Sequence, residues 1–131
     1  MIDFQDVSVS FPLPNGQQRS VLEEVSFHLD RSEKAYLVGP TGSGKSTILR
    51  LLYMDLFPDS GSVRIGDYHS SQIEDEEIPY LRRSIGGVFQ DFQLLPDRNA
   101  YENVAFALYA TGRSKSEVKS RVTKALGRVG L

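Results

Sequence analysis

The chain has 131 residues, of which 40% are hydrophobic and 24% charged, a composition that predicts one globular domain with a single core. It contains no cysteine, and its two histidines, His28 and His69, lie far apart, which excludes a disulfide framework, a zinc site and a thiol nucleophile. The formal net charge is −2, no segment reaches the ~18 apolar residues of a membrane span, and the N-terminus lacks a secretory signal, so we predict a cytoplasmic protein.

The first 30 residues are predicted to form an antiparallel hairpin or meander. Apolar and polar residues alternate over residues 2–11, with a one-residue slip after Phe4 that indicates a bulge. Residues 12–16 have the composition of a turn, and the alternation returns over residues 25–29. The next apolar run, residues 35–38, ends at a glycine and is typical of a buried strand in a parallel sheet.

A helix and two further strands are expected in the middle of the chain. Apolar residues recur at helical spacing from Lys45 to Phe57, and Pro58 ends the pattern. Residues 63–65 are predicted as an edge strand and residues 85–90 as a strand of the parallel sheet. The acidic run at residues 74–77 is interpreted as an exposed loop or helix start rather than a metal site.

Two helices are predicted towards the C-terminal end, each with a capping box. Asn99 is followed by Glu102 and Ser114 by Glu117, the spacing at which the cap and third-residue side chains satisfy each other's backbone N–H groups. Residues 113–131 contain six Lys or Arg and one Glu, which a solvated helix face explains, so we predict no nucleic-acid binding. The second helix carries an apolar stripe that needs a covering element, formed by Val118, Val122, Ala125 and Val129.

The segment between residues 35–38 and the predicted helix matches the P-loop pattern G-x-x-x-x-G-K-[ST]. Glycines let such a loop fold round phosphate groups with its N–H groups pointing inward, and a helix N-terminus favours negative charge. In this pattern Lys45 reaches the β and γ phosphates and the Ser46 hydroxyl binds Mg²⁺. We therefore predict a nucleoside triphosphate site that consists of Gly39, Pro40, Thr41, Gly42, Ser43, Gly44, Lys45, Ser46 and Thr47.

The remaining sequence favours ATP as the nucleotide. A GTPase needs an N-K-x-D motif and a D-x-x-G switch after the P-loop, and neither string occurs. A small-molecule kinase usually opens with its P-loop strand, whereas 38 residues precede the loop here. A P-loop kinase stays an alternative, which an assay for phosphoryl transfer to small acceptors would reveal.

The N-terminal strands, the P-loop and the run at residues 85–96 together resemble the ATPases of ABC transporters over essentially the whole chain. The resemblance implies that Phe11 stacks on adenine, a contact worth about 1–3 kcal/mol per base in nucleic-acid complexes. An ordinary position in the core is the alternative for Phe11. The resemblance also implies that Gln90 contacts Mg²⁺ and the attacking water and signals to a membrane partner.

Within this family, residues 78–86, 89–91 and 97–105 are similar to the cell-division ATPases, which work with a membrane protein at the division site. This similarity implies a partner whose cytoplasmic helix docks near Gln90 to Tyr101, and a location on the inner face of the cell membrane. ATPases of lipoprotein release and macrolide export share much of the pattern. A non-catalytic division scaffold that only binds nucleotide and partner is a further alternative.

Several features depart from the family pattern. Ser32 stands where the family usually has glycine before the P-loop strand, and Met54-Asp55 replaces a common glycine in the P-loop helix. A signature loop of the L-S-G-G-Q type and a Walker B strand with its catalytic glutamate do not occur in the 131 residues. We therefore expect the N-terminal part of one ABC ATP-binding domain, which binds ATP but hardly hydrolyses it and whose open strand edges favour self-association or marginal folding.

The predicted fold class is α/β, a P-loop NTPase of the ABC ATPase type with three parts. Residues 1–34 form an antiparallel β subdomain, residues 35–96 the P-loop core with an incomplete parallel sheet, and residues 97–131 the start of a helical subdomain. The resemblance implies that a second ABC domain is the dimer partner, with ATP sandwiched between the two.

Overall fold

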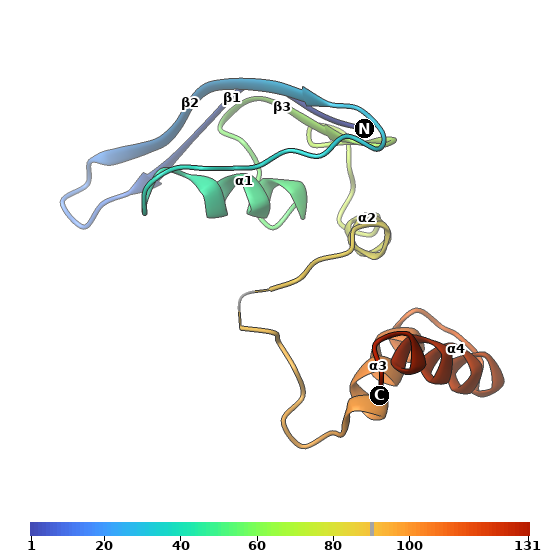
Figure 1. Cartoon of the computed structure of the whole chain (residues 1–131). Coiled ribbons are helices and arrows are strands. Elements are labelled where there is room, and N and C mark those ends of the chain that lie inside the picture. The colour runs from blue at the N-terminus through green and yellow to red at the C-terminus, as the bar shows by residue number, and fades with distance from the viewer. Residues whose placement is uncertain (90) are drawn as a thin grey trace. The chain divides into compact units, whose positions relative to one another are not determined.

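The computed structural model describes residues 1–89 and 91–131 (Figure 1). It divides the chain into two compact units, Met1–Ile85 and Gly86–Leu131, and each is treated separately below. No helix in the described part of the chain is both long and apolar enough to cross a membrane.

The N-terminal unit begins with the predicted hairpin. β1 (Ile2–Pro12) pairs antiparallel with β2 (Gln18–Leu29), and the Leu13 and Gly16 amides close the turn by donating to the Gln17 and Leu13 carbonyls at 2.7 and 2.9 Å. The predicted bulge is confirmed, because the pairing register shifts between Phe4 and Val7. The bulge brings Phe4 and Val7 to the buried side of the strand, where they are exposed by 1% and 0%.

A second antiparallel connection completes the sheet. β3 (Ser60–Ile65) pairs with the other edge of β1, and the short β4 (Tyr68–His69) pairs with β3, so the strand order is β2-β1-β3-β4. Residues 63–65, predicted as an edge strand, therefore lie one strand inside the edge. The Asp59 carboxylate accepts the Ser10 amide at 2.6 Å, which ties the start of β3 to β1.

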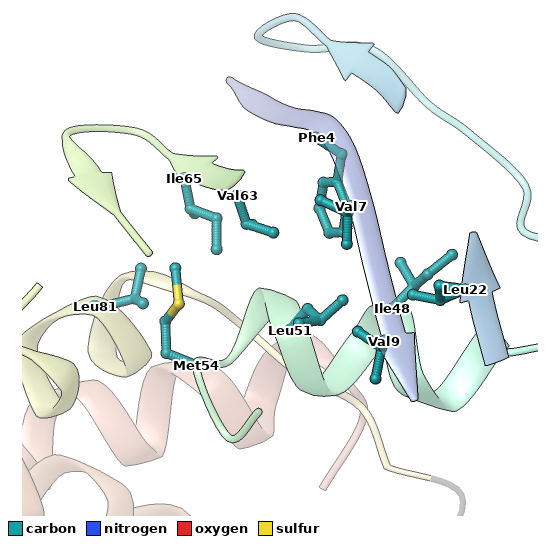
Figure 2. Close-up of a cluster of buried hydrophobic side chains, with 10 residues drawn as sticks. All are labelled: Phe4, Val7, Val9, Leu22, Ile48, Leu51, Met54, Val63, Ile65 and Leu81. Atoms are coloured by element: carbon teal, nitrogen blue, oxygen red, sulfur yellow. The ribbon is translucent and has the colours of Figure 1, made fainter. Parts of the chain in front are cut away.

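The helix α1 (Lys45–Leu52) packs on one face of this sheet (Figures 1 and 2). Figure 2 shows Ile48 and Leu51 pointing from α1 towards β1, with Leu22 of β2 beside Ile48. The short helix α2 (Ile78–Ser84) adds Leu81 to the same core. The buried core of this unit consists of Phe4, Val7, Val9, Leu22, Ile48, Leu51, Met54, Val63, Ile65 and Leu81.

The helix α1 ends at Leu52, five residues earlier than the predicted Phe57, because Met54 adopts a left-handed backbone conformation with φ 49°. Ser32 also has a left-handed φ, of 68°. Both are positions where the resemblance leads us to expect glycine, and a left-handed φ is the conformation that glycine adopts most readily. The guanidinium of Arg82 holds the Met54 turn by donating to the carbonyls of Tyr53 and Met54 at 2.9 and 3.2 Å.

The prediction that residues 35–38 form a strand is wrong, because these residues form no strand in the structure. Residues 85–89 form none either, and Gln90, the last residue of that predicted strand, lies outside the described residues. A strand needs hydrogen-bonded neighbours, and within the described residues all strands belong to the antiparallel sheet. The two segments predicted to form the parallel sheet are therefore not paired as strands in the described residues.

The acidic run at residues 74–77 leads into α2, as one of the two readings of the sequence predicted. The Glu77 carboxylate accepts the Glu74 amide at 3.1 Å, which is a local turn contact. Among the described residues no group of three or more acidic, His or Cys side chains is arranged to hold a metal.

The C-terminal unit is a pair of helices, α3 (Ala100–Ala110) and α4 (Lys115–Arg128). Both predicted capping boxes are confirmed, at Asn99 with Glu102 and at Ser114 with Glu117. The helices pack through a small core of Ala105, Val118 and Val122, with Val104, Leu108 and Leu126 partly buried beside it.

The predicted apolar stripe of α4 is half right. Val118 and Val122 are buried, but Ala125 and Val129 are exposed and Leu126 takes the next position on the packed face. The reason is helical spacing: Val118, Val122 and Leu126 follow each other at four-residue intervals and so lie along one side of the helix. The stripe is covered by α3, which the sequence did not reveal.

Candidate phosphate-binding site

The P-loop connects residues 35–38 to the N-terminus of α1. The helix cap is Gly44, whose carbonyl accepts the Ile48 amide at 3.0 Å, and no acidic residue occupies the first turn. The free N–H groups of that turn and the helix dipole therefore act together on a bound anion, with no carboxylate to oppose them.

Two glycines of the loop are needed for its shape. Gly42 and Gly44 have φ angles of 84° and 88°, in the left-handed region that other residues rarely adopt. At Gly44 there is also no room for a side chain, because a Cβ would lie 2.7 Å from Leu22 Cδ2 and 3.1 Å from the Val21 carbonyl oxygen. The loop thus packs directly on β2, and the sheet sets its position.

Lys45, the first residue of α1, turns back along the loop. Its ammonium group donates to the carbonyls of Gly39 and Pro40 at 2.8 and 2.6 Å and lies 3.5 Å from Ser43 Oγ. An ammonium has three donor protons, and two of them are held by the short bonds. The third is engaged only by the long contact to Ser43, so it is available to a phosphate oxygen in the loop.

A cavity of about 390 Å³ lies over the loop and is called the P-loop cavity below. Its lining contains two cationic side chains and no acidic one, so the cavity favours anions. The lining residues are Arg19, Val21, Thr41, Gly42, Gly44, Lys45, Ser46 and Thr47. Six of the predicted P-loop residues thus meet at one cavity, while Gly39, Pro40 and Ser43 act on Lys45.

Ser46 is the residue predicted to bind Mg²⁺. It is exposed and lines the P-loop cavity, whereas its neighbour Thr47 is only 8% exposed. Mg²⁺ prefers oxygen ligands and usually takes one or two from the protein and the rest from phosphates and water. A single serine hydroxyl in a cavity without carboxylates fits that mode and does not fit a closed, all-protein metal cage.

Of the two remaining predicted site residues, Phe11 is described by the structure and Gln90 is not. Phe11 on β1 is half-buried and packs beside the core, and it is not part of the lining of the P-loop cavity. Its cross-strand partner is Arg19, which does line the cavity. Gln90 lies outside the described residues, so its predicted roles stay predictions.

Arg19 and Val21 are the site residues that the sequence reasoning missed. They lie two positions apart on β2, so their side chains project from the same face of the sheet. The loop motif does not include them, because they reach the cavity through the packing of β2 on Gly44. The period-two spacing was present in the sequence, but nothing in it showed that this face meets the loop.

Comparison with known protein families shows that residues 22–131 match the ABC transporter family. Curated relatives include the cell division ATP-binding protein FtsE of Streptococcus pneumoniae serotype 2, 40% identical over 131 residues, which are 100% of this chain and 55% of the relative. The FtsE protein of Escherichia coli K12 is also 40% identical over the whole chain, which covers 57% of that relative. The chain therefore spans about half the length of the curated relatives it matches.

Among solved structures, the chain resembles a dimeric, post-hydrolysis state of the ATP-binding cassette MJ0796 bound to ADP and Pi. The TM-score is 0.84 with 30% sequence identity, over 97% of this chain and 56% of that one. This likeness confirms the predicted fold class, since the matched structure is an ATP-binding cassette with a helix and sheet arrangement similar to the one described here.

Proposed function

Because the chain belongs to the ABC transporter family, we propose that it binds ATP together with Mg²⁺ through the P-loop of residues 39–47. The observation that carries this proposal is the P-loop cavity, where a glycine loop, a helix N-terminus and the Lys45 ammonium converge without an opposing carboxylate. The relatives called ATP-binding proteins and the neighbour bound to ADP and Pi support it.

Each part of the loop has a distinct task in this proposal. The backbone N–H groups that begin α1 hydrogen-bond phosphate oxygens, and the remaining proton of Lys45 binds the β and γ phosphates. The Ser46 hydroxyl is one ligand of Mg²⁺, which neutralises charge on the triphosphate. The loop needs the sheet behind it, because Gly44 is held against Leu22 and Val21 of β2.

The nucleoside end is assigned to Phe11. Its ring lies on the strand next to β2, and it is half-buried against the core, which leaves part of the ring for a base. Stacking of adenine on this ring is expected to contribute about 1–3 kcal/mol. Phe11→Ala is then expected to weaken ATP but not inorganic triphosphate, and an equal loss for both would make Phe11 a structural residue.

The test of ATP binding uses Lys45→Ala in the 131-residue chain, with Lys34→Ala as the control. Lys34 is exposed and does not line the P-loop cavity. Titration calorimetry with MgATP is expected to show binding by the parent chain and by Lys34→Ala, and none by Lys45→Ala, because a charge-assisted phosphate contact is lost. Equal affinities of the parent chain and Lys45→Ala would overturn the assignment.

Hydrolysis is proposed for the family's assembled site and not for these 131 residues alone. The general base and signature loop expected of an ABC ATPase do not occur in the sequence, so turnover by this chain should be negligible. Gln90 is proposed to contact Mg²⁺ and the attacking water, and a second ABC domain to complete the site across a dimer. Phosphate release that depends on Mg²⁺ and disappears in Lys45→Ala would instead show that another carboxylate, such as Asp91 or Asp97, has the catalytic role.

The proposed membrane partner is an FtsX-like protein that couples the ATPase to cell division at the inner face of the cell membrane. Its docking site is assigned to the segment from Gln90 to Tyr101 and the adjoining face of α3. There a hollow of about 310 Å³ is lined by Leu95, Arg98, Tyr101, Glu102, Ala105, Phe106 and Tyr109. Three aromatic residues of this lining are exposed, by 38% at Tyr101, 58% at Phe106 and 48% at Tyr109. Exposed aromatic residues grouped in one hollow are typical of the contact centre of an interface.

Co-purification with an FtsX-like membrane protein tests this docking site. Phe106→Ala is expected to reduce recovery of the partner, whereas Lys119→Ala, on the exposed side of α4, should leave it unchanged. Equal recovery with both variants would move the docking site elsewhere. Recovery that needs no ATP would favour the non-catalytic scaffold, and recovery of a lipoprotein-release or macrolide-export partner instead would reassign the branch of the family.

A further inference from the structure

The side of the P-loop cavity that faces β2 carries a cation that no loop motif predicts. Arg19 and Val21 both line the cavity, because they lie on one face of β2. A Cβ built on Gly42 would lie 3.8 Å from Arg19 Nη2, so the guanidinium lies beside the phosphate-binding loop itself. Arg19 therefore approaches the same space as the ammonium of Lys45 from the opposite element.

The Arg19 guanidinium is free to take a ligand. Within residues 1–89 and 91–131 it has no hydrogen bond, ion pair or ring contact. Its five N–H donors are all available, and their planar arrangement suits two oxygens of one phosphate. Lys45, by contrast, gives two of its three protons to the carbonyls of Gly39 and Pro40.

The pairing of β1 with β2 places Arg19 between Phe11 and the P-loop. Phe11 and Arg19 are directly paired across β1 and β2, so their side chains project from the same face. A nucleotide whose base stacks on Phe11 and whose phosphates enter the P-loop must pass Arg19. Nη2 lies on the loop side, beside Gly42, and this position favours a phosphate group over the base as the contact of Arg19.

We propose that Arg19 is a further phosphate-binding residue of this site, which β2 supplies to the triphosphate of the bound nucleotide opposite Lys45. This inference rests on the proposed function of the P-loop. Its physical basis is the unpaired guanidinium in a cavity without acidic residues, where an arginine adds charge and two directed hydrogen bonds. The packing of Gly44 on β2 then has a second consequence, since it brings a phosphate ligand from the sheet to the loop.

The experiment compares Arg19→Gln with Arg19→Lys and with the control Arg31→Gln. Arg31 follows β2, is exposed and does not line the P-loop cavity. Each variant of the 131-residue chain is titrated by calorimetry with MgATP and with inorganic triphosphate, at low and at high salt. We expect Arg19→Gln to weaken both probes about tenfold and to reduce the salt dependence of binding, Arg19→Lys to lose less, and Arg31→Gln to match the parent chain.

Two results would overturn the inference and leave the proposed function of the P-loop intact. Weakening of MgATP without weakening of triphosphate would assign Arg19 to the nucleoside, and parent-like binding of both probes by Arg19→Gln would remove it from the site. If the parent chain binds neither probe, the proposed function fails as well. If the parent chain binds, Lys45→Ala does not and Arg19→Gln does, only the role of Arg19 fails. Urea unfolding of each variant separates a loss of ligand contact from a loss of fold.

Discussion

Two segments of the N-terminal unit, β1 and residues 35–38, are both predicted as strands from the sequence and differ in environment. On β1, Phe4 and Val7 are exposed by 1% and 0%, whereas Tyr36 and Val38 are exposed by 90% and 84%. β1 has hydrogen-bonded neighbours on both edges. Residues 35–38 pair with no strand in the part of the chain that the structure describes.

The difference shows what a strand needs beyond its own composition. β1 is joined to β2 by a short turn, so its first neighbour is supplied by the next segment of the chain at little entropic cost. A strand of a parallel sheet depends on neighbours that are distant in sequence. Apolar β-branched and aromatic residues favour a strand only where such neighbours and a packed face are present.

The largest expected effect on stability is the loss of the Phe4 ring from β1, with removal of the Tyr36 ring from residues 35–38 as the comparison. Phe4 is buried and stacks on Phe27 of β2 with ring centroids 4.4 Å apart. Phe4→Ala should lower the free energy of unfolding by about 3–5 kcal/mol, because it leaves a cavity in the core. Tyr36→Ala should change it by less than about 0.5 kcal/mol. Urea unfolding measures both, and a comparable loss for Tyr36→Ala would mean that residues 35–38 are packed in solution.

A second experiment breaks the contact between the hairpin and the P-loop. Gly44→Ala combines a left-handed φ of 88° with a clash against Leu22, whereas Gly16→Ala has a similar φ of 79° and open space around it. The strained φ should cost about 1–2 kcal/mol in both, and overpacking should add about 1–3 kcal/mol at Gly44. Urea unfolding and calorimetry with MgATP should show lost ATP binding in Gly44→Ala only. Equal stability and binding of the two variants would contradict the packing of the loop on β2.

A smaller effect concerns the turn that leads from the hairpin to residues 35–38. Ser32 has a φ of 68°, so Ser32→Gly should raise the free energy of unfolding by about 0.5–1 kcal/mol, the relief of strain exceeding the greater flexibility of glycine in the unfolded chain. Ser32→Ala keeps the same strain and should give no gain. A thermal unfolding midpoint that rises in both variants would show that strain at Ser32 is not the cause.

The smallest effect is a pH dependence of stability that arises at His28 in the hairpin. The His28 imidazole lies 3.1 Å from Asp3 and 3.2 Å from Asp30, and hydrogen bonds to Asp3 and then Asp30 raise the pKa of His28 above its ordinary 6.5. The bond from His28 lowers the pKa of Asp3 below 3.8. Stability from His28 is therefore complete below about pH 6.5 and is lost as the pH rises through the higher folded pKa, while that from Asp3 is lost as the pH falls below 3.8.

Urea midpoints measured between pH 5 and pH 9 test this dependence. The decline with rising pH should disappear in His28→Gln. It should persist in His69→Gln, because within residues 1–89 and 91–131 the His69 ring is hydrogen-bonded to Ser71 and to no carboxylate. A decline that persists in His28→Gln would assign the dependence to other groups.

Much of the candidate site could be predicted from the sequence because the residues that define it lie close together in the chain. A P-loop is defined by glycines, a lysine and a hydroxyl within eight positions, and the helix that follows it is indicated by the spacing of Ile48 and Leu51. The bulge after Phe4 and the capping boxes at Asn99 and Ser114 are local in the same way, and the structure contains all three.

What only the tertiary structure decided depends on contacts between distant segments. Arg19 enters the site because β2 packs on Gly44, and no pattern within either segment shows that approach. The early end of α1 follows from the left-handed Met54 and from Arg82, which lies 28 residues away and donates to its carbonyl. Residues 35–38 have the sequence of a buried strand, but a strand is made by its neighbours, and those are set by the fold rather than by the segment itself.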